Sequence, residues 1–277
     1  MQADTTVPAP PRRRPRRRAG RAPVALLVPA VLGLVFLVLP LAGLLVRAPW
    51  TSLPERLAAP GVLTALGLSI QTATMATALC LVLGVPLAWL LARVEFPGRR
   101  VVRALVTVPL VLPPVVGGVA LLLVFGRNGI LGAWLDSAFG ITLPFTTAGV
   151  VLAEAFVAMP FLVIAVEGAL RGADSRYEEA AATLGAGRWT TFTRVTLPLV
   201  APGVAAGAVL CWARALGEFG ATITFAGNFP GRTQTMPLAV YLALETDLQA
   251  AIVLSLILLT VSVAILACLR DKWIAGS

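Results

Sequence analysis

The chain has 277 residues, of which 58% are hydrophobic and 13% are charged, and its formal net charge is +9. In ordinary soluble domains about 25% of the residues are charged. The composition therefore excludes a typical soluble domain, which would expose large apolar patches, and it favours a protein that lies in lipid. The basic balance does not by itself indicate nucleic-acid binding, because the charges form short clusters between long apolar runs.

The missing residue types exclude several kinds of site. The chain contains no histidine and a single lysine, Lys272, which is followed by Trp273. It therefore has no serine–histidine triad, no histidine metal ligand and no P-loop, which ends in Gly-Lys-Ser/Thr. We expect no catalytic residue, metal or cofactor in this chain. Cys80, Cys211 and Cys268 lie in apolar stretches, so we expect small hydrophobic residues rather than a disulfide framework.

Residues 1–22 form a basic segment that is rich in proline and arginine. A cleaved secretory signal would need an apolar core of about 7–15 residues, but the run that follows, 24–46, is longer. We therefore expect residues 1–22 to be a disordered cytoplasmic tail and the following run to be an uncleaved span. Nucleic acid or anionic lipid would explain the arginines; attraction to lipid is sufficient, and we predict no nucleic-acid partner.

Residues 23–277 are predicted to form an all-α transmembrane domain. A membrane-spanning helix needs about 20 predominantly apolar residues. Charged residues inside a span are costly, so the fourth span, with Glu154 and Glu167, and the fifth, with Arg214 and Glu218, are expected to face protein or a transport pathway. The six predicted spans are residues 24–46, 63–91, 104–125, 147–169, 199–221 and 249–269.

Prolines and glycines inside the spans predict kinks and close helix contacts. Pro113 and Pro114 lie in the third span, and neighbouring helices can tolerate the kinks that such residues cause. Gly203 and Gly207 form a GxxxG motif in the fifth span. This motif permits close approach either to another helix of the chain or to a second copy, and the sequence leaves both interpretations open.

The lysine and arginine residues fall mainly on one side of the predicted spans. Cytoplasmic loops of membrane proteins keep such residues. With the N-terminus inside, 17 of the 22 lie in the tail, in the loops near 93–103 and 171–198, and after the last span. We therefore predict a multi-pass protein of the cytoplasmic membrane with both termini in the cytoplasm.

The loop between the fourth and fifth spans contains a short predicted helix. Ser175 and Glu178 match a capping box, in which each side chain satisfies a free backbone N–H. The alanine-rich run Glu178–Leu184 favours helix, and Gly185 and Gly187 are expected to end it.

This short helix has a predicted docking face. Tyr177, Ala181 and Leu184 share one side at helical spacing, which leaves Arg176 and Glu178 largely in water. A helix of this length is marginal on its own, and small alanines allow another surface to approach closely. The pattern therefore suggests a partner protein.

The segment 174–198 also carries a specific spacing: Glu-Ala-Ala, three residues, glycine, nine residues, a hydrophobic residue, any residue and Leu-Pro. It resembles the "EAA" signature of permease subunits of bacterial ABC importers, and the similarity in span pattern extends over about residues 63–269. The resemblance implies a type I ABC importer permease fold, with this cytoplasmic segment as a coupling helix seated in a groove of a separate ATPase. We interpret Glu179 as a contact with that ATPase; the alternative is that its charge only favours the helix N-terminus. The residues that match the signature or its helix are Glu179, Ala180, Ala181, Leu184, Gly185, Val195, Leu197 and Pro198.

The stretch from Ala213 to Tyr241 is similar to the corresponding stretch of molybdate-type permeases. Sulfate-type permeases resemble its first part and usually diverge afterwards. The resemblance implies that the chain translocates an oxyanion, molybdate or tungstate in preference to sulfate. A permease for sulfate or another oxyanion is the alternative.

Within this stretch, Arg214 and Glu218 are four residues apart and are expected to share a helix face. Either Arg214 offers positive potential to a dianion while Glu218 restrains it, or the pair is a structural salt bridge that fixes helix packing. In the first interpretation Thr222, Thr224 and Asn228 supply hydrogen-bond donors along the substrate pathway.

The resemblance also implies a set of partners. These are a second copy of the chain, two copies of a cytoplasmic ABC ATPase that holds ATP and Mg, an extracytoplasmic oxyanion-binding protein and membrane lipid. A function of another class, an ion-coupled secondary transporter, would require intramembrane carboxylates or broken helices at the midplane. Glu154 and Glu167 are the residues that favour that alternative.

Overall fold

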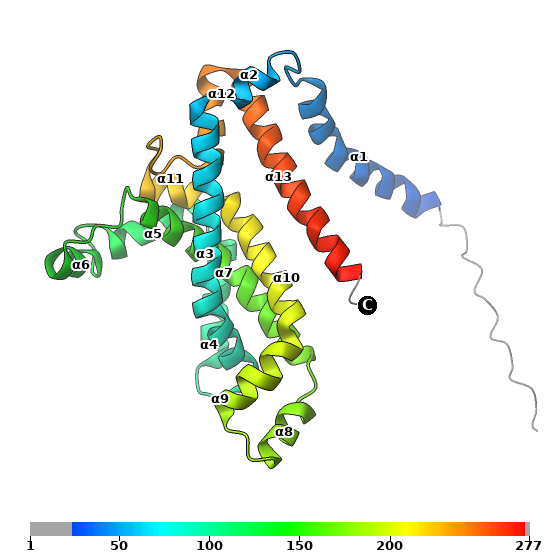
Figure 1. Cartoon of the computed structure of the whole chain (residues 1–277), viewed down its shortest axis with the longest axis vertical. Helices are drawn as coiled ribbons and strands as arrows, with labels where there is room; N and C mark the ends of the chain where they lie inside the picture. Colours follow the sequence, from blue (N-terminus) through cyan, green and yellow to red (C-terminus); the bar gives the residue numbers. More distant parts are fainter. Residues whose placement is uncertain (1–23, 275–277) are drawn as a thin grey trace, which may run out of the picture. The chain divides into compact units, whose positions relative to one another are not determined.

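The computed structural model describes residues 24–274, with side chains from 26 to 265, and all regular elements in this range are helical (Figure 1). The predicted tail therefore lies outside the described residues. The chain divides into two units, Met1–Val46 and Arg47–Ser277. The elements are α1 (Val24–Val46), α2 (Leu53–Leu57), α3 (Pro60–Arg93), α4 (Arg99–Val111), α5 (Pro114–Phe125), α6 (Gly132–Phe139), α7 (Thr147–Gly172), α8 (Arg176–Thr183), α9 (Arg188–Thr191), the π-helical turn η1 (Phe192–Thr196), α10 (Leu197–Leu216), α11 (Gly220–Ala226), α12 (Met236–Thr246) and α13 (Leu248–Ile274).

The predicted spans correspond to helices that are long and apolar enough to cross a membrane. Helices α1, α3, α7 and α13 each meet this criterion, and so does the continuous run of α9, η1 and α10. The pair α4 and α5 gives a sixth candidate if the two helices count as one span. The prediction of an all-α, multi-pass membrane protein is confirmed.

The third predicted span, residues 104–125, corresponds to two helices, α4 and α5, and the kink predicted at its prolines is a sharp bend. Helices α4 and α5 meet at a bend of 118°. Leu112 and Pro113 both have extended backbone, with ψ values of 130° and 129°. Proline lacks an N–H and disfavours helical backbone in the residue before it, so Pro113 and Pro114 end α4 and start α5 in a new direction.

The fifth predicted span, residues 199–221, is correct only in part. The helical run begins at Arg188 and ends at Leu216, and residues 217–219 interrupt it before α11. In η1 the backbone N–H of Leu197 donates to the carbonyl of Phe192, five residues back. This wider turn lies directly before Pro198, which cannot donate a helical hydrogen bond, so the helix continues through the proline.

Helix α7 is at the centre of the 47–274 unit. In its most apolar stretch of 18 residues, 67% of the residues are buried. In the corresponding stretches of the other candidate spans, at most 33% are buried. Its N-terminus is capped by Thr146, whose hydroxyl accepts a hydrogen bond from the N–H of Gly149 at 3.1 Å. Helices α3 and α10 pack along it around small buried residues. Cys80 and Cys211 lie in this core as buried free thiols, as predicted.

Both acidic residues of α7 are buried and hydrogen-bonded. Glu154 is 1% exposed; its Oε1 atom accepts a hydrogen bond from the hydroxyl of Thr72 on α3 at 2.9 Å, and its Oε2 atom is buried with no partner among the described residues. Glu167, 8% exposed, pairs with Arg103 of α4 at 2.7 Å and with Arg171 one turn later at 2.8 Å. These contacts confirm that the fourth span faces protein, because buried charges need such partners.

The GxxxG motif brings α10 close to α7 of the same chain. A Cβ added to Gly203 would lie 2.3 Å from the Cβ of Ala169, and one added to Gly207 would lie 3.0 Å from the Cβ of Ala165. Of the two interpretations that the sequence leaves open, the structure supports packing within the chain.

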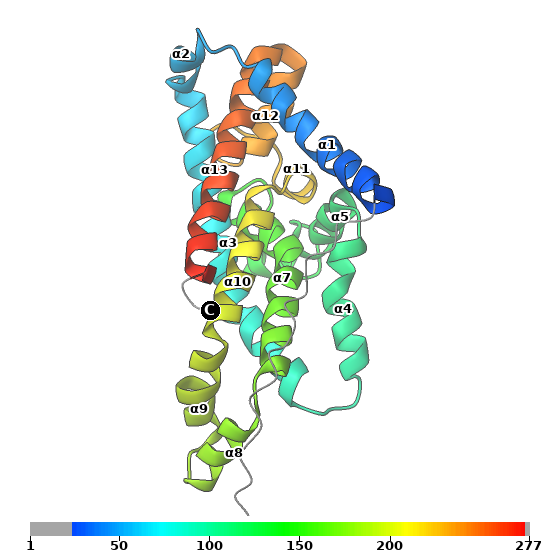
Figure 2. The same ribbon diagram turned by 90° about the vertical axis from the view of Figure 1, so that its right-hand side faces the viewer.

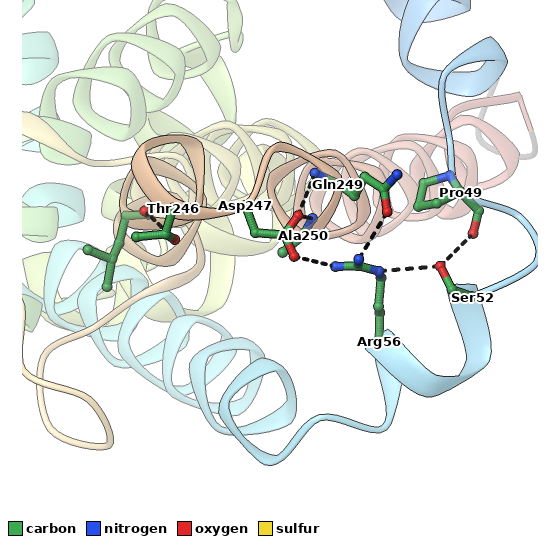
Figure 3. Close-up of polar contacts among 8 residues, drawn as sticks. Pro49, Ser52, Arg56, Thr246, Asp247, Gln249 and Ala250 are labelled. Atoms are coloured by element: carbon green, nitrogen blue, oxygen red, sulfur yellow. Dashed lines mark hydrogen bonds and ion pairs between the residues drawn. The ribbon is translucent and has the colours of Figure 1, made fainter.

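A polar cluster ties α2 to the junction of α12 and α13, at the end of the 47–274 unit opposite α8 (Figure 3). Arg56 donates to Asp247 at 2.7 Å, to the side-chain oxygen of Gln249 at 3.0 Å and to the hydroxyl of Ser52 at 3.3 Å. Asp247 also accepts from the backbone N–H groups of Ala250 and Gln249 at the start of α13. The Arg56 guanidinium, followed by these backbone donors, lowers the pKa of Asp247.

We expect Gly203→Ala to destabilise the folded protein by about 1–3 kcal/mol, because the new methyl group overlaps Ala169. The matched control is Gly168→Ala on α7, where an added Cβ has nothing within 4 Å and the change should be neutral or slightly stabilising. Chemical unfolding in detergent, followed by circular dichroism, measures both. Equal stability of the two variants would contradict close packing of α10 on α7.

The lowered pKa of Asp247 predicts a pH dependence of stability. The ionised carboxylate stabilises the native state above its ordinary pKa of 3.8, and this contribution is lost as the pH falls through the lower native value. The difference in melting temperature between wild type and Asp247→Asn in detergent should be constant above about pH 5 and should shrink below pH 3.8. Glu245→Gln, at an exposed acid of α12, serves as the control for the removal of one surface charge. A difference between wild type and Asp247→Asn that stays constant down to pH 3 would refute the ion pair.

Candidate functional site

The predicted coupling segment, residues 174–198, lies at one end of the 47–274 unit, beyond the ends of α3, α7 and α10 (Figures 1 and 2). Helix α8 ends with Gly185 in left-handed backbone, φ +83°. The N–H of Gly185 donates to the carbonyl of Ala182, and that of Ala186 donates to the carbonyl of Ala181, both at 3.0 Å. These two bonds form a Schellman cap, so the predicted stop at Gly185 is confirmed. Gly187 instead has extended backbone and precedes α9.

The predicted capping box at the start of α8 is wrong. Ser175 has helical backbone, and its hydroxyl donates to Glu179 at 3.2 Å rather than accepting from the backbone. The cap comes from Asp174, whose carboxylate accepts from the N–H of Arg176 at 3.0 Å. This arrangement leaves the Glu178 side chain available for other partners.

The prediction that Glu178 lies largely in water is wrong. Its Oε1 atom accepts from Nε of Arg93, the last residue of α3, at 3.1 Å and lies 3.0 Å from Nη2 of the same guanidinium. The same oxygen accepts from the hydroxyl of Thr196, the last residue of η1, at 3.1 Å. Arg176 is exposed, as predicted.

The outer face of α8 carries exposed apolar side chains. Tyr177 is 59% exposed and Leu184 is 89% exposed. Ala180 lies between them at helical spacing and is exposed, whereas Ala181, which was predicted for this face, is half-buried. Trp189 at the start of α9 is 75% exposed. Clustered apolar side chains of this kind are typical of a protein-binding surface.

The two parts of the signature lie next to each other. Glu179 is exposed on α8, Val195 is half-buried in η1, and Leu197 and Pro198 open α10. The hydrogen bond between Glu178 and Thr196 joins the two parts. The motif therefore forms one continuous surface region rather than two separate elements.

Arg214 and Glu218 form an ion pair at 2.5 Å, but not on one helix. Helix α10 ends at Leu216, and Glu218 lies in the break before α11. Its second carboxylate oxygen accepts from the N–H of Ala221 at 2.7 Å, and the residue is 1% exposed. Both oxygens of Glu218 therefore join α10 to the start of α11, which matches the structural interpretation of this pair.

The other predicted pathway residues lie in or directly after α11. Thr222 is fully buried, and its hydroxyl has no partner among the described residues. Thr224 donates to the carbonyl of Gly220 in its own helix. The side-chain oxygen of Asn228 is buried and also has no partner within 24–274. Gly118 of α5 lets α11 approach closely, because a Cβ there would lie 2.6 Å from the Cβ of Thr224.

Sequence reasoning missed Arg93, Glu178 and Thr196 as a group. Arg93 was counted only as a basic residue of an inner loop, and Thr196 occupied the free position of the signature. Arg93 and Glu178 are 85 residues apart, so no local spacing relates them. An indication in the sequence was that Thr196 lies within the signature, at the position where any residue is allowed.

The family description "Binding-protein-dependent transport system inner membrane component" matches residues 84–275. The chain belongs to this family. Members of it are membrane components of transport systems, so the chain is a transport component and not an enzyme.

Two relatives and one solved structure agree with this family. The chain is 52% identical over 235 residues to the "Molybdenum transport system permease protein ModB" of Mycobacterium bovis. The aligned residues cover 85% of this chain and 89% of that protein. It is 38% identical over 236 residues to the "Sulfate transport system permease protein CysT" of Escherichia coli, with 84% and 85% covered. A bacterial ABC transporter involved in the import of the acidic polysaccharide alginate shares the fold, with a TM-score of 0.70 at 19% identity over 90% of this chain and 93% of that one.

Proposed function

We propose that the chain is the membrane-spanning subunit of an ATP-driven importer and that its substrate is an oxyanion, molybdate or tungstate in preference to sulfate. The similarity to the molybdenum permease of Mycobacterium bovis supports this choice, because its identity of 52% exceeds the 38% identity to the sulfate permease. The stretch 213–241 agrees with this choice, since it resembles molybdate-type permeases.

The observation that carries the proposal is the exposed apolar face of α8. A transporter driven by ATP needs a nucleotide site, and this chain has no P-loop. A separate ATPase must therefore bind to it. Tyr177, Ala180 and Leu184 offer a binding surface at one end of the 47–274 unit, with Glu179 beside them. In this proposal ATP and Mg are held by that ATPase.

The arrangement of the complex follows from the same surface. We place α8 on the cytoplasmic side, because most of the lysine and arginine residues flank the spans on that side. Two copies of the chain would present two α8 helices to two ATPase subunits. An extracytoplasmic oxyanion-binding protein would deliver substrate at the opposite end, where α2 and α12 lie. ATP binding would then switch the complex between two packings.

The alternative of an ion-coupled secondary transporter has little support in the contacts of α7. Such a mechanism needs an intramembrane carboxylate that can take up and release an ion. Glu167 is held by two arginines, Arg103 and Arg171. Glu154 is 1% exposed and hydrogen-bonded to Thr72, so neither group is accessible from an open pathway.

Uptake into vesicles tests the proposal. We expect vesicles that contain the chain, its ATPase and its binding protein to accumulate labelled molybdate only when ATP is present on the α8 side. Excess unlabelled tungstate should reduce uptake strongly, and sulfate should reduce it less. Uptake without ATP or without the binding protein would refute an importer. Stronger competition by sulfate than by tungstate would refute only the substrate assignment.

Charge reversal at Glu179 tests the role of α8. We expect Glu179→Arg to lower ATP-driven uptake about tenfold or more, because it places a like charge in an interface that should complement the acid. The protein should remain inserted, since Glu179 is exposed and, among the described residues, its side chain is hydrogen-bonded to Ser175 alone. The matched control for ATPase binding is Glu245→Arg, which reverses an exposed acid on α12 at the opposite end of the 47–274 unit and should leave ATPase binding unchanged. Normal ATPase binding and normal uptake by Glu179→Arg would refute the assignment of α8.

A further inference from the structure

Helix α8 is too short and too exposed to hold its own position. It has eight residues, and none of them is buried. Isolated helices shorter than about 12–15 residues are marginal in water. Apolar packing therefore does not fix this helix on the rest of the molecule, and other contacts must do so.

The carboxylate of Glu178 supplies such contacts. Its Oε1 atom lies within 3.1 Å of three donor atoms, two on Arg93 and one on Thr196. These groups are largely shielded from water: the side chains of Arg93 and Glu178 are 18% and 21% exposed, and Thr196 is 1% exposed. Charge-assisted hydrogen bonds in such surroundings are stronger and more directional than those at an open surface.

The contacts of Glu178 lead to two different helices. Arg93 is the last residue of α3, and its guanidinium also reaches the carbonyl of Ala173, just before α8, at 3.5 Å. Thr196 directly precedes α10 in a continuous helical run. Both α3 and α10 pack along the central helix α7. One carboxylate thus connects α8 to the two helices that flank the core.

A cavity of about 400 Å³ lies beside this connection. It lies between α8 and the ends of α3 and η1, and its lining includes Trp89, Arg93, Glu178 and Thr196. Glu95 lines the same cavity but is exposed and makes no ion pair or hydrogen bond among the contacts found in residues 24–274. Space beside α8 would let the helix shift if the connection through Glu178 were lost.

We propose that Glu178 is a positioning residue that transmits movement of α8 to α3 and α10. The inference rests on the proposed function of α8 as the ATPase-coupling helix and assigns the two neighbouring acids different roles. Glu179 faces outward toward the ATPase, whereas Glu178 faces inward and makes α8 move together with the membrane helices. Without Glu178 the ATPase still binds and hydrolyses ATP, but α8 shifts into the cavity beside it and the membrane helices do not follow.

The test is the ratio of molybdate taken up to ATP hydrolysed, measured on vesicles that contain the complete complex. Glu178→Gln removes the charge and keeps the shape of the side chain. We expect it to retain the ATPase and its hydrolysis while the ratio falls about tenfold, within the usual range of coupling free energies. The matched control is Glu95→Gln, which removes one negative charge from the same cavity and should leave the ratio unchanged.

Two further variants keep the test decisive if Glu178→Gln is poorly inserted. Thr196→Val removes only the connection to α10, and it should lower the ratio less than Glu178→Gln does. The exchange Glu178→Arg with Arg93→Glu restores an ion pair in the reverse sense. This double exchange should recover most of the uptake-to-hydrolysis ratio, whereas neither single substitution should do so. A role of Glu178 in folding alone would not produce ATP hydrolysis without uptake.

The outcomes separate this inference from the proposed function. A ratio for Glu178→Gln equal to that of Glu95→Gln would overturn the inference. So would loss of the ATPase from the Glu178→Gln complex, because Glu178 would then act in binding rather than in transmission. ATP-independent uptake by the wild type, or normal uptake by Glu179→Arg, would instead overturn the proposed function.

Discussion

The packing of this molecule depends on one constraint: each charged group among the apolar helices must be neutralised or hydrogen-bonded by another part of the chain. Glu167 meets Arg103 and Arg171, and Glu218 meets Arg214 and a backbone N–H. The Glu167–Arg103 pair joins α7 to α4, and Glu218 joins the two sides of the break between α10 and α11, whereas the Glu167–Arg171 pair lies within α7. The few charges inside the spans therefore determine which helices meet, while the apolar residues supply most of the buried area.

Interruptions of the helices obey the same constraint. Where α4 and α5 meet, proline supplies residues that lack an N–H, so fewer backbone donors are left without partners. Where α10 ends, Glu218 accepts from the N–H of Ala221 at the start of α11. Before Pro198, the π-helical turn keeps the helix continuous although one hydrogen bond is missing. The helices are thus interrupted where a proline removes a backbone N–H or where a nearby side chain accepts a hydrogen bond from one.

Sequence reasoning located the spans because hydropathy depends only on local composition, and it located the end of α8 because left-handed backbone favours Gly185. It could not foresee the bend of 118° between α4 and α5, since a proline predicts a kink but not its angle. The capping box failed because Asp174 competes with Ser175 for the same N-terminal position. The partners of Glu178 were beyond reach, because Arg93 comes near only after α3 and α7 have packed.

The contrast between Glu178 and Glu179 shows how a short helix can both bind a partner and transmit its movement. Successive residues of an α-helix point about 100° apart, so two adjacent acids face different surroundings. One side of α8 is free for contact with another protein, and the other side meets α3 and η1. A smooth apolar contact would let α8 slide. A carboxylate with three donors around one oxygen resists sliding, because hydrogen bonds weaken steeply when their geometry is disturbed. A polar connection is therefore better suited than apolar packing to carry a directed displacement from a surface helix into the membrane helices.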